Sequence, residues 1–291
     1  MTTHVAEPVY LNGRFLPLAE AHVSPLDRGF LYGDGVYEVV PVYSRQPFRI
    51  TEHLKRMQAT LDGIQLRNPL PTAEWQAVIM QLIAQAPWED QSIYLQVTRG
   101  ADDKRDHAFP PASVQPTVFA FASPMITPSA ETRAQGVAAI SVADQRWARC
   151  DLKVLSLLAN VLARQEAVAQ GCAEALLIRD GYLKEGAASN IFIVKDGLLI
   201  APPKTQLMLP GITYDVILEL AAQHGQPLAV REIAEAELRT ADEVWMTSST
   251  KEILAITTLD GQPVGTGRPG PCGERMWQWY QDFKNNVMRQ G

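Results

Sequence analysis

Three Asx-Gly pairs constrain the fold of this chain more than any other feature. Asn12-Gly13 lies within the apolar run 9–16, Asp180-Gly181 follows the run 175–178, and Asp196-Gly197 separates the runs 190–194 and 198–200. Asx-Gly pairs tolerate the positive φ angles of tight turns between strands. The sequence therefore predicts a type I′ hairpin at 9–16 and a succession of short strands joined by turns in the second half.

Helical patterns are mixed with these strands. Thr51 and Gly63 are the expected N-cap and end of one helix, and Thr72 begins another. One face of the second helix carries its apolar residues: Trp75, Val78, Ile79, Leu82 and Ile83. Further helices are expected at 156–170, at 213–224 and after Pro271, and further strands at 36–40, 93–98, 118–121, 137–142 and 243–246. Because helices and strands do not alternate strictly, the pattern favours an α+β fold.

A change in composition suggests where the chain divides. The polar segment 123–129 contains Pro124 and Pro128, as an interdomain connection often does. We therefore predict a small domain at 1–123, a linker at 124–135 and a larger domain at 136–291.

Composition excludes several classes of protein. The chain has 46% hydrophobic and 20% charged residues, as soluble globular proteins do, and its 26 basic against 32 acidic residues give a net charge of −6. No basic run could follow a nucleic-acid backbone, no apolar run is long enough to cross a membrane, and no metal site is predicted. Three cysteines without CxxC spacing, and an N-terminus unlike a signal peptide, favour a cytoplasmic protein.

Lys153 is the candidate catalytic residue. It lies among apolar neighbours in the segment 150–158, where we expect a strand to give way to a helix. Apolar surroundings remove water from an ammonium group, lower its pKa and leave a free amine that can attack carbonyl groups. The alternative is an ordinary lysine whose ammonium reaches the solvent.

Four further motifs occur in a fixed order around Lys153. They are Gly33-Asp34-Gly35-Val36-Tyr37-Glu38, Glu185-Gly186-Ala187-Ala188-Ser189-Asn190, Leu209-Pro210-Gly211-Ile212-Thr213 and Thr247-Ser248-Ser249-Thr250. Over nearly its whole length the chain resembles the class IV aminotransferases, the fold-type IV enzymes that use pyridoxal 5′-phosphate (PLP). The resemblance implies a small N-terminal α/β domain and a larger C-terminal domain with a β-barrel-like core.

The resemblance also implies how PLP is bound. Lys153 would hold the cofactor as a Schiff base and carry the proton between substrate and cofactor, and Glu185 would pair with the pyridine nitrogen. Arg56, which by pattern alone would be a surface arginine, matches the arginine that binds the phosphate. Ile212 with Thr213, and Ser248 with Ser249, match two regions that bind the phosphate. Leu209 matches a residue that packs on the cofactor ring, and Arg146 matches a residue near the 3′ oxygen of the ring. Thr213 could also be a plain N-cap, and both roles can hold together.

The substrate is indicated by a second set of residues. Arg105 and His107, together with Tyr37, resemble the Arg-x-His and tyrosine set with which D-amino acid transaminases bind the substrate carboxylate. Thr250, the last residue of the motif 247–250, is also expected to bind the substrate. The resemblance implies transamination between a D-amino acid such as D-alanine and 2-oxoglutarate or pyruvate. It also implies a homodimer in which the partner subunit supplies the Arg-x-His loop.

Two departures from the D-specific pattern leave alternatives open. The loop from Gly100 to Arg105 is one residue longer, and Ala187-Ala188 stands where D-specific members carry serines. The alternatives are an L-branched-chain aminotransferase, an aminodeoxychorismate lyase on the same fold, and a nonenzymatic binding protein. Lys153 and Glu185 together argue against the last of these.

Overall fold

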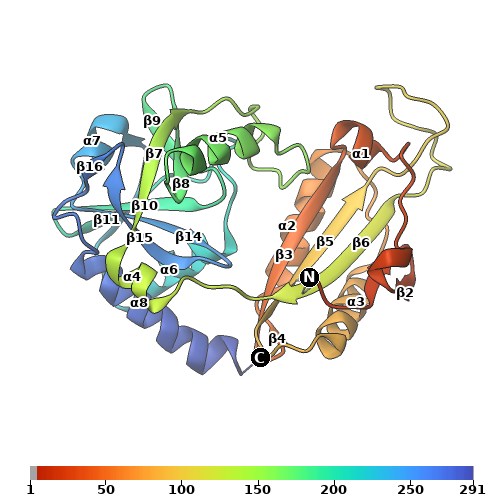
Figure 1. Ribbon diagram of the computed structural model, residues 1–291, viewed down its shortest axis with the longest axis horizontal. Coiled ribbons are helices and arrows are strands. Elements are labelled where there is room, and N and C mark those ends of the chain that lie inside the picture. The colour runs from red at the N-terminus through yellow and green to blue at the C-terminus, as the bar shows by residue number, and fades with distance from the viewer. Residues whose placement is uncertain (1–4, 291) are drawn as a thin grey trace. The chain divides into compact units, whose positions relative to one another are not determined.

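The chain forms two compact units. A computed structural model describes residues 5–290 of the 291-residue chain. The first unit comprises Met1–Met125, Leu152–Leu157 and Asn285–Gly291, and the second comprises Ile126–Asp151 and Leu158–Lys284. Each unit has its own sheet (Figure 1).

The first unit is built on a six-stranded antiparallel sheet. Its strands are β1 (Val9–Leu11), β2 (Arg14–Leu16), β3 (Gly35–Tyr43), β4 (Gln46–Pro47), β5 (Gln91–Thr98) and β6 (Thr117–Pro124), in the order β2-β1-β6-β5-β3-β4. The predicted hairpin between β1 and β2 is confirmed, and Asn12 and Gly13 have φ angles of 47° and 87°. These positive angles are those of a type I′ turn.

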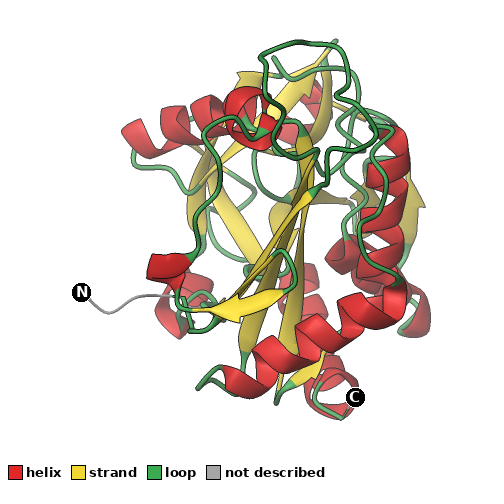
Figure 2. Ribbon diagram, turned by 90° about the vertical axis from the view of Figure 1, so that its right-hand side faces the viewer, coloured by secondary structure: helices red, strands yellow, loops and turns green. Residues whose placement is uncertain are grey.

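Two helices cover one face of this sheet (Figures 1 and 2). They are α2 (Ile50–Gly63) and α3 (Thr72–Gln85); the short α1 (Arg28–Tyr32) and the 3-10 helix Leu18–Glu20 precede them. The five apolar residues predicted for the buried face of α3 are its buried residues. They pack with Val36, Val40 and Leu61 into one core.

The predicted ends of α2 were partly wrong. Its N-cap is Arg49, whose φ of 50° lies in the left-handed region, so Thr51 is within the first turn. Gly63 is the last residue of the helix, as predicted, and a side chain there would require Leu152 to move. A Cβ at this position would lie 2.5 Å from a methyl group of Leu152.

The second unit contains a ten-stranded mixed sheet that curls around its own core (Figure 1). Its strands are β7 (Val137–Ala143), β8 (Glu174–Arg179), β9 (Tyr182–Gly186), β10 (Asn190–Lys195), β11 (Leu198–Ala201), β12 (Leu228–Val230), β13 (Ile233–Ala234), β14 (Glu243–Ser248), β15 (Glu252–Leu259) and β16 (Gln262–Pro263). The order is β12-β11-β10-β14-β15-β7-β8-β9-β13, with β16 on β15. The curled sheet agrees with the expected barrel-like core.

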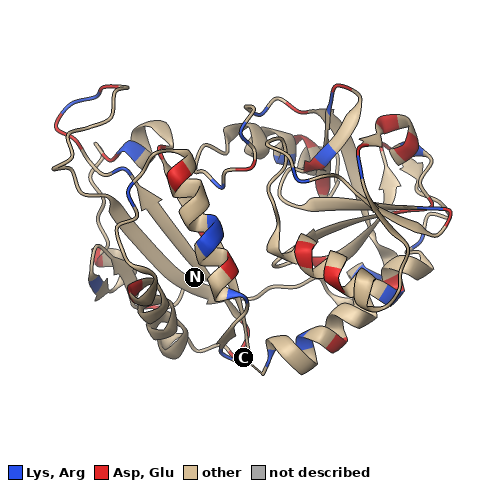
Figure 3. Ribbon diagram, turned by 180° about the vertical axis from the view of Figure 1, so that it is seen from behind, with Lys and Arg blue, Asp and Glu red and all other residues tan. Residues whose placement is uncertain are grey.

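Helices surround this sheet. They are α4 (Ala130–Gln135), α5 (Leu158–Ala169), α6 (Ile212–Gln223), α7 (Glu235–Arg239) and α8 (Pro271–Phe283), followed by the π-helix Lys284–Met288. Helix α5 begins two residues later than predicted, since 152–157 forms an irregular segment of the first unit. Charged residues of both signs are mixed over the two units (Figure 3). Within residues 5–290, no helix has the length and apolar character needed to cross a membrane.

Candidate active site

Glu185 is a buried carboxyl group at the centre of a hydrogen-bond cluster in the second unit. It lies on β9, only 5% exposed, and pairs through Oε1 with Nη1 of Arg146. The backbone N–H of Leu209 donates to both carboxylate oxygens at 3.2 Å, and Asn190 Nδ2 donates to Oε2 at 3.3 Å. Burial raises the pKa of Glu185 to about 7, although Arg146 and the Leu209 N–H oppose the shift.

Arg146 is fixed by a second carboxylate. Its Nε and Nη2 donate to the two oxygens of Asp144 at 2.9 and 3.0 Å, and Nη2 also donates to the Leu207 carbonyl at 3.2 Å. Burial alone would raise the pKa of Asp144, but its contacts with Arg146 lower it overall. The buried ion pair with Asp144 therefore holds Arg146 against Glu185. That Arg146 lies near the cofactor's 3′ oxygen stays a prediction.

Asn190 connects Glu185 to the start of α6. Its Nδ2 also donates to the Leu209 carbonyl at 3.0 Å, and a Cβ on Gly211 would lie 2.1 Å from its Oδ1. Gly211 is the N-cap of α6 and has no side chain. The first N–H groups of the helix, around Ile212 and Thr213, therefore receive no side-chain acceptor from this residue. Such a helix start is suited to a phosphate group.

The predicted motif at 248–250 lies close to the same cluster. Asn190 pairs with Thr247 across β10 and β14, and β14 ends at Ser248. Ser249 and Thr250 form the turn that follows, where Ser248 Oγ accepts the Lys251 N–H at 3.1 Å. The second unit thus brings together Glu185, Leu209, Ile212, Thr213 and Ser248.

A buried network that the sequence did not indicate supports this turn. Lys251 Nζ donates to Glu174 Oε2 at 3.1 Å, and Ser189 Oγ donates to the same oxygen at 2.7 Å. Glu174 is fully buried on β8. Through Glu174 the turn after β14 is connected to the loop that follows Glu185. A single acidic residue in an apolar strand was the only sequence signal for it.

Lys153 lies in the first unit, on the irregular segment 152–157. The segment is attached to β3 by the bridge between Val36 and Val154 and by a hydrogen bond of 3.0 Å from the Tyr37 N–H to the Lys153 carbonyl. Lys153 Nζ lies 4.2 Å from the centre of the Tyr37 ring. Two residues predicted for the site, the lysine and the tyrosine, are therefore in contact. The ring of Tyr37 stacks on Tyr94, with centroids 5.8 Å apart.

Arg56 is bound by a buried glutamate. Its Nε and Nη2 donate to Glu38 Oε2 and Oε1 at 2.9 and 2.6 Å, and its side chain is only 11% exposed. His53 Nδ1 lies 3.1 Å from Glu38 Oε1. Burial would raise the pKa of Glu38, but Arg56 and His53 lower it far below its usual value, whereas burial lowers the pKa of His53. Arg56 is therefore held in one orientation by a charged partner and is not an ordinary surface arginine.

Arg105 and His107 lie on an exposed loop. Both flank Tyr32 of α1: the Arg105 guanidinium is 5.2 Å from the ring centre, and the His107 ring is 5.5 Å away. Arg28 holds the loop by donating to the carbonyls of Asp106 and Ala108 at 2.6 and 3.1 Å. Over residues 5–290, no hydrogen bond or ring contact joins Tyr37 to this loop, so the three residues do not meet within one chain.

Comparison with known proteins places the chain in a family. Residues 35–259 match the family described as amino-transferase class IV. The chain is 38% identical over 263 residues to a D-alanine aminotransferase of Bacillus licheniformis, covering 90% of this chain and 92% of that protein. It is 35% identical over 277 residues to a D-alanine aminotransferase of Staphylococcus aureus strain MW2, covering 95% of this chain and 98% of that protein.

Solved structures agree on the fold. The branched-chain amino acid aminotransferase of Escherichia coli has a TM-score of 0.89 and 29% identity, covering 95% of this chain and 94% of that chain. The T.th. branched-chain amino acid aminotransferase, solved with pyridoxamine 5′-phosphate, has a TM-score of 0.87 and 29% identity, covering 95% and 93%.

The chain belongs to the class IV aminotransferases, and its fold is the fold-type IV α+β fold. The cofactor of this family is PLP. The donors described above fit it. A raised-pKa carboxyl group suits a ring nitrogen, and an uncapped helix start and a fixed guanidinium suit a phosphate.

Proposed function

We propose that this protein is a PLP-dependent D-amino acid aminotransferase. It exchanges an amino group between a donor such as D-alanine and a 2-oxo acid such as 2-oxoglutarate or pyruvate. Two relatives named D-alanine aminotransferases, 38% and 35% identical over at least 90% of the chain, support the choice of substrate. The observation that carries the chemistry is Glu185, a buried carboxyl group fixed by three donors with its pKa raised to about 7.

Glu185 determines the protonation of the cofactor ring in this proposal. PLP, when bound, supplies the electron sink for the charge left on the substrate Cα. The negative charge of the Glu185 carboxylate is poorly solvated. A protonated pyridine nitrogen beside it neutralises this charge, so Glu185 favours the protonated form of the ring. Asp144 contributes by holding Arg146, which in turn orients Glu185.

Lys153 and the phosphate ligands complete the assignment. Lys153 moves the proton at the substrate Cα, and the Tyr37 ring beside it limits the positions open to its ammonium group. Arg56, the start of α6 with Ile212 and Thr213, and the Ser248-Ser249 turn bind the phosphate. Leu209 packs on the ring.

The substrate carboxylate is bound by Arg105 and His107 of the partner subunit in a homodimer, together with Tyr37 and Thr250. This fits the exposure of the loop and the lack of contact between it and Tyr37 within residues 5–290 of one chain. A homodimer is supported by apolar residues on α5. Leu158, Val161, Leu162 and Val168 are 70%, 57%, 59% and 49% exposed.

A second candidate is transamination of L-branched-chain amino acids. It is favoured by the two solved structures described above, which are branched-chain aminotransferases 29% identical to this chain. The D-specific proposal is preferred because the D-alanine relatives are more similar in sequence.

The protein is proposed to act in the cytoplasm. Cys150, Cys172 and Cys272 are free thiols, as expected in a reducing compartment.

The two candidates are separated by single-turnover reactions. Holoenzyme is mixed with D-alanine, L-leucine or (R)-1-phenylethylamine, and conversion of bound PLP to its amine form is followed by absorbance. We expect D-alanine to react fastest, and Arg105→Ala with His107→Ala to lower kcat/KM for D-alanine by roughly ten- to a hundredfold, the scale of a lost charge-assisted pair. Faster reaction with L-leucine would replace the D-specific proposal, and preference for the carboxylate-free amine would reject the loop as the anchor.

A further inference from the structure

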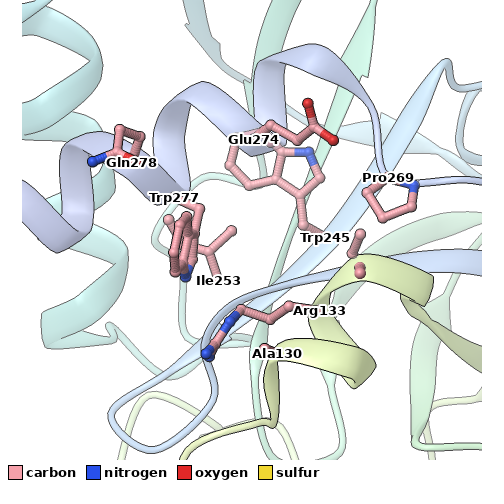
Figure 4. A pocket seen from close by; sticks show the side chains of 11 residues that line it. Ala130, Arg133, Trp245, Ile253, Pro269, Glu274, Trp277 and Gln278 are labelled. Atoms are coloured by element: carbon pink, nitrogen blue, oxygen red, sulfur yellow. The ribbon is translucent and has the colours of Figure 1, made fainter.

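The second unit contains a pocket whose residues have no part in the proposed chemistry. It lies between α4, the strands β14 and β15, and α8, and holds about 420 Å³ (Figure 4). Trp245 and Ile253, which are 1% and 4% exposed, form its deepest part. Trp277, Arg133 and Glu274 line it nearer the solvent.

A positively charged side chain lies at one end of the pocket. The guanidinium of Arg133 lies 5.2 Å from the Trp277 ring centre, and in the described part of the chain no carboxylate pairs with it. The Nε1 of Trp277 is buried, so this side chain offers the pocket its ring and not its donor. A guanidinium without a carboxylate partner is suited to an anionic group with two acceptor oxygens.

The rest of the pocket is suited to an uncharged ring. Trp245 Nε1 already donates to Glu243 at 3.2 Å, so this side chain offers the pocket only its apolar surface. Glu274 lies on the opposite side of the pocket from Arg133 in Figure 4. Its negative charge disfavours an anionic group at that end. A ligand is therefore oriented with its anion toward Arg133 and its ring toward Trp245.

We propose that this pocket binds a small aromatic carboxylate. The carboxylate accepts hydrogen bonds from the Arg133 guanidinium, and the flat ring packs on Trp245 and Ile253. The volume of about 420 Å³ admits a molecule of one or two fused rings. This site is independent of the proposed transamination, because neither Arg133 nor Trp277 contacts the Glu185 cluster or Lys153.

The test uses 2-naphthoate as the probe and the uncharged 2-naphthamide as its matched control. Calorimetric titration of the holoenzyme should give saturable binding of 2-naphthoate, and at least tenfold weaker binding of the amide, about the scale of a lost charge-assisted bond. Arg133→Gln should weaken the binding of 2-naphthoate by about ten- to a hundredfold. Arg14→Gln, at an exposed strand residue outside the pocket, should leave binding unchanged.

The variants are first checked for PLP content and circular dichroism, so that unfolding is not mistaken for lost binding. An equal affinity for the amide, or an unchanged affinity of Arg133→Gln for 2-naphthoate, would overturn the proposal. Absence of binding to the unmodified holoenzyme would do the same.

Discussion

At the scale of single residues, the second unit stabilises a carboxyl group in an unusual state. Glu185 is surrounded by donors, yet burial raises its pKa to about 7. The neighbouring Asp144 has a lowered pKa, since its contacts with Arg146 outweigh its burial. Two acidic groups that share one arginine are thereby separated into a permanent anion and a group that can exchange a proton near neutral pH.

Glu185 should make the stability of the cofactor-free protein depend on pH. Its pKa rises from 4.5 to about 7 on folding, so the folded state binds the proton more tightly. The resulting stabilisation is complete below the unfolded pKa and is lost as pH rises through the folded pKa. Relative to Glu185→Gln, the free energy of unfolding of the unmodified protein should fall by about 3 kcal/mol between about pH 4.5 and pH 8.

Urea unfolding of both proteins across this range measures the difference. A difference that stays constant with pH, or that grows as pH rises, would mean that Glu185 is already ionised in the folded protein at acidic pH. The glutamine keeps the size of the side chain, so the comparison isolates its charge.

At the scale of elements, the start of α6 and the strand β10 depend on each other. The side chain of Asn190, the first residue of β10, holds the Leu209 carbonyl and touches Glu185, and it leaves no room for a side chain on Gly211. A cofactor bound at the helix start would therefore be sensitive to a single methyl group.

Gly211→Ala should weaken PLP binding. The added Cβ would lie 2.1 Å from Asn190 Oδ1, so either the side chain or the helix start must move. We expect a loss of about 1–3 kcal/mol in PLP affinity, the scale of one broken buried hydrogen bond. Gly225→Ala is the matched control. No atom lies within 4 Å of the added Cβ, so the only strain comes from the backbone φ of 67°. Equal PLP affinity in the two variants would contradict this role for Asn190.

How well the elements could be predicted depends on how local their causes are. Helix α3 was predicted well because one apolar face determines it, and the Asx-Gly turns were recognisable from two residues each. Strand β9 was missed because Lys184 and Glu185 are polar residues buried by ion pairs with distant partners. Such pairs leave no periodic pattern in the sequence.

In the candidate site, too, residues with a local sequence signal could be predicted and residues that depend on distant partners could not. Lys153, Arg56 and Glu185 could be selected because they match a family pattern. Asp144 and Glu174, which bind Arg146 and Lys251, belong to no motif, and Glu38, although it ends the motif 33–38, was not predicted to bind Arg56. The roles of Asp144 and Glu174 depend on which strands of the second unit lie side by side, and the order β10-β14-β15-β7-β8-β9 is not apparent from the chain order.

At the scale of the whole molecule, the exposed apolar residues of α5 should form part of a subunit interface. Leu162→Glu places a charge among Leu158, Val161 and Val168 and should shift the protein toward monomers in sedimentation velocity experiments. Transamination should fall with the dimer fraction, since the Arg-x-His loop is proposed to act in the partner. Met80→Glu is the control, because Met80 is 45% exposed on another helix. Unchanged assembly of Leu162→Glu would place the interface elsewhere.

The proposed role of Lys153 as the residue that binds PLP determines how the rest of the site is assigned. This role is measured by reducing the holoenzyme with borohydride, digesting it and locating the cofactor by mass spectrometry. We expect one labelled peptide, with PLP fixed to Nζ of Lys153, and no label in Lys153→Ala. Label on another residue, such as Lys251 near Glu174, or the same labelling in Lys153→Ala, would contradict it.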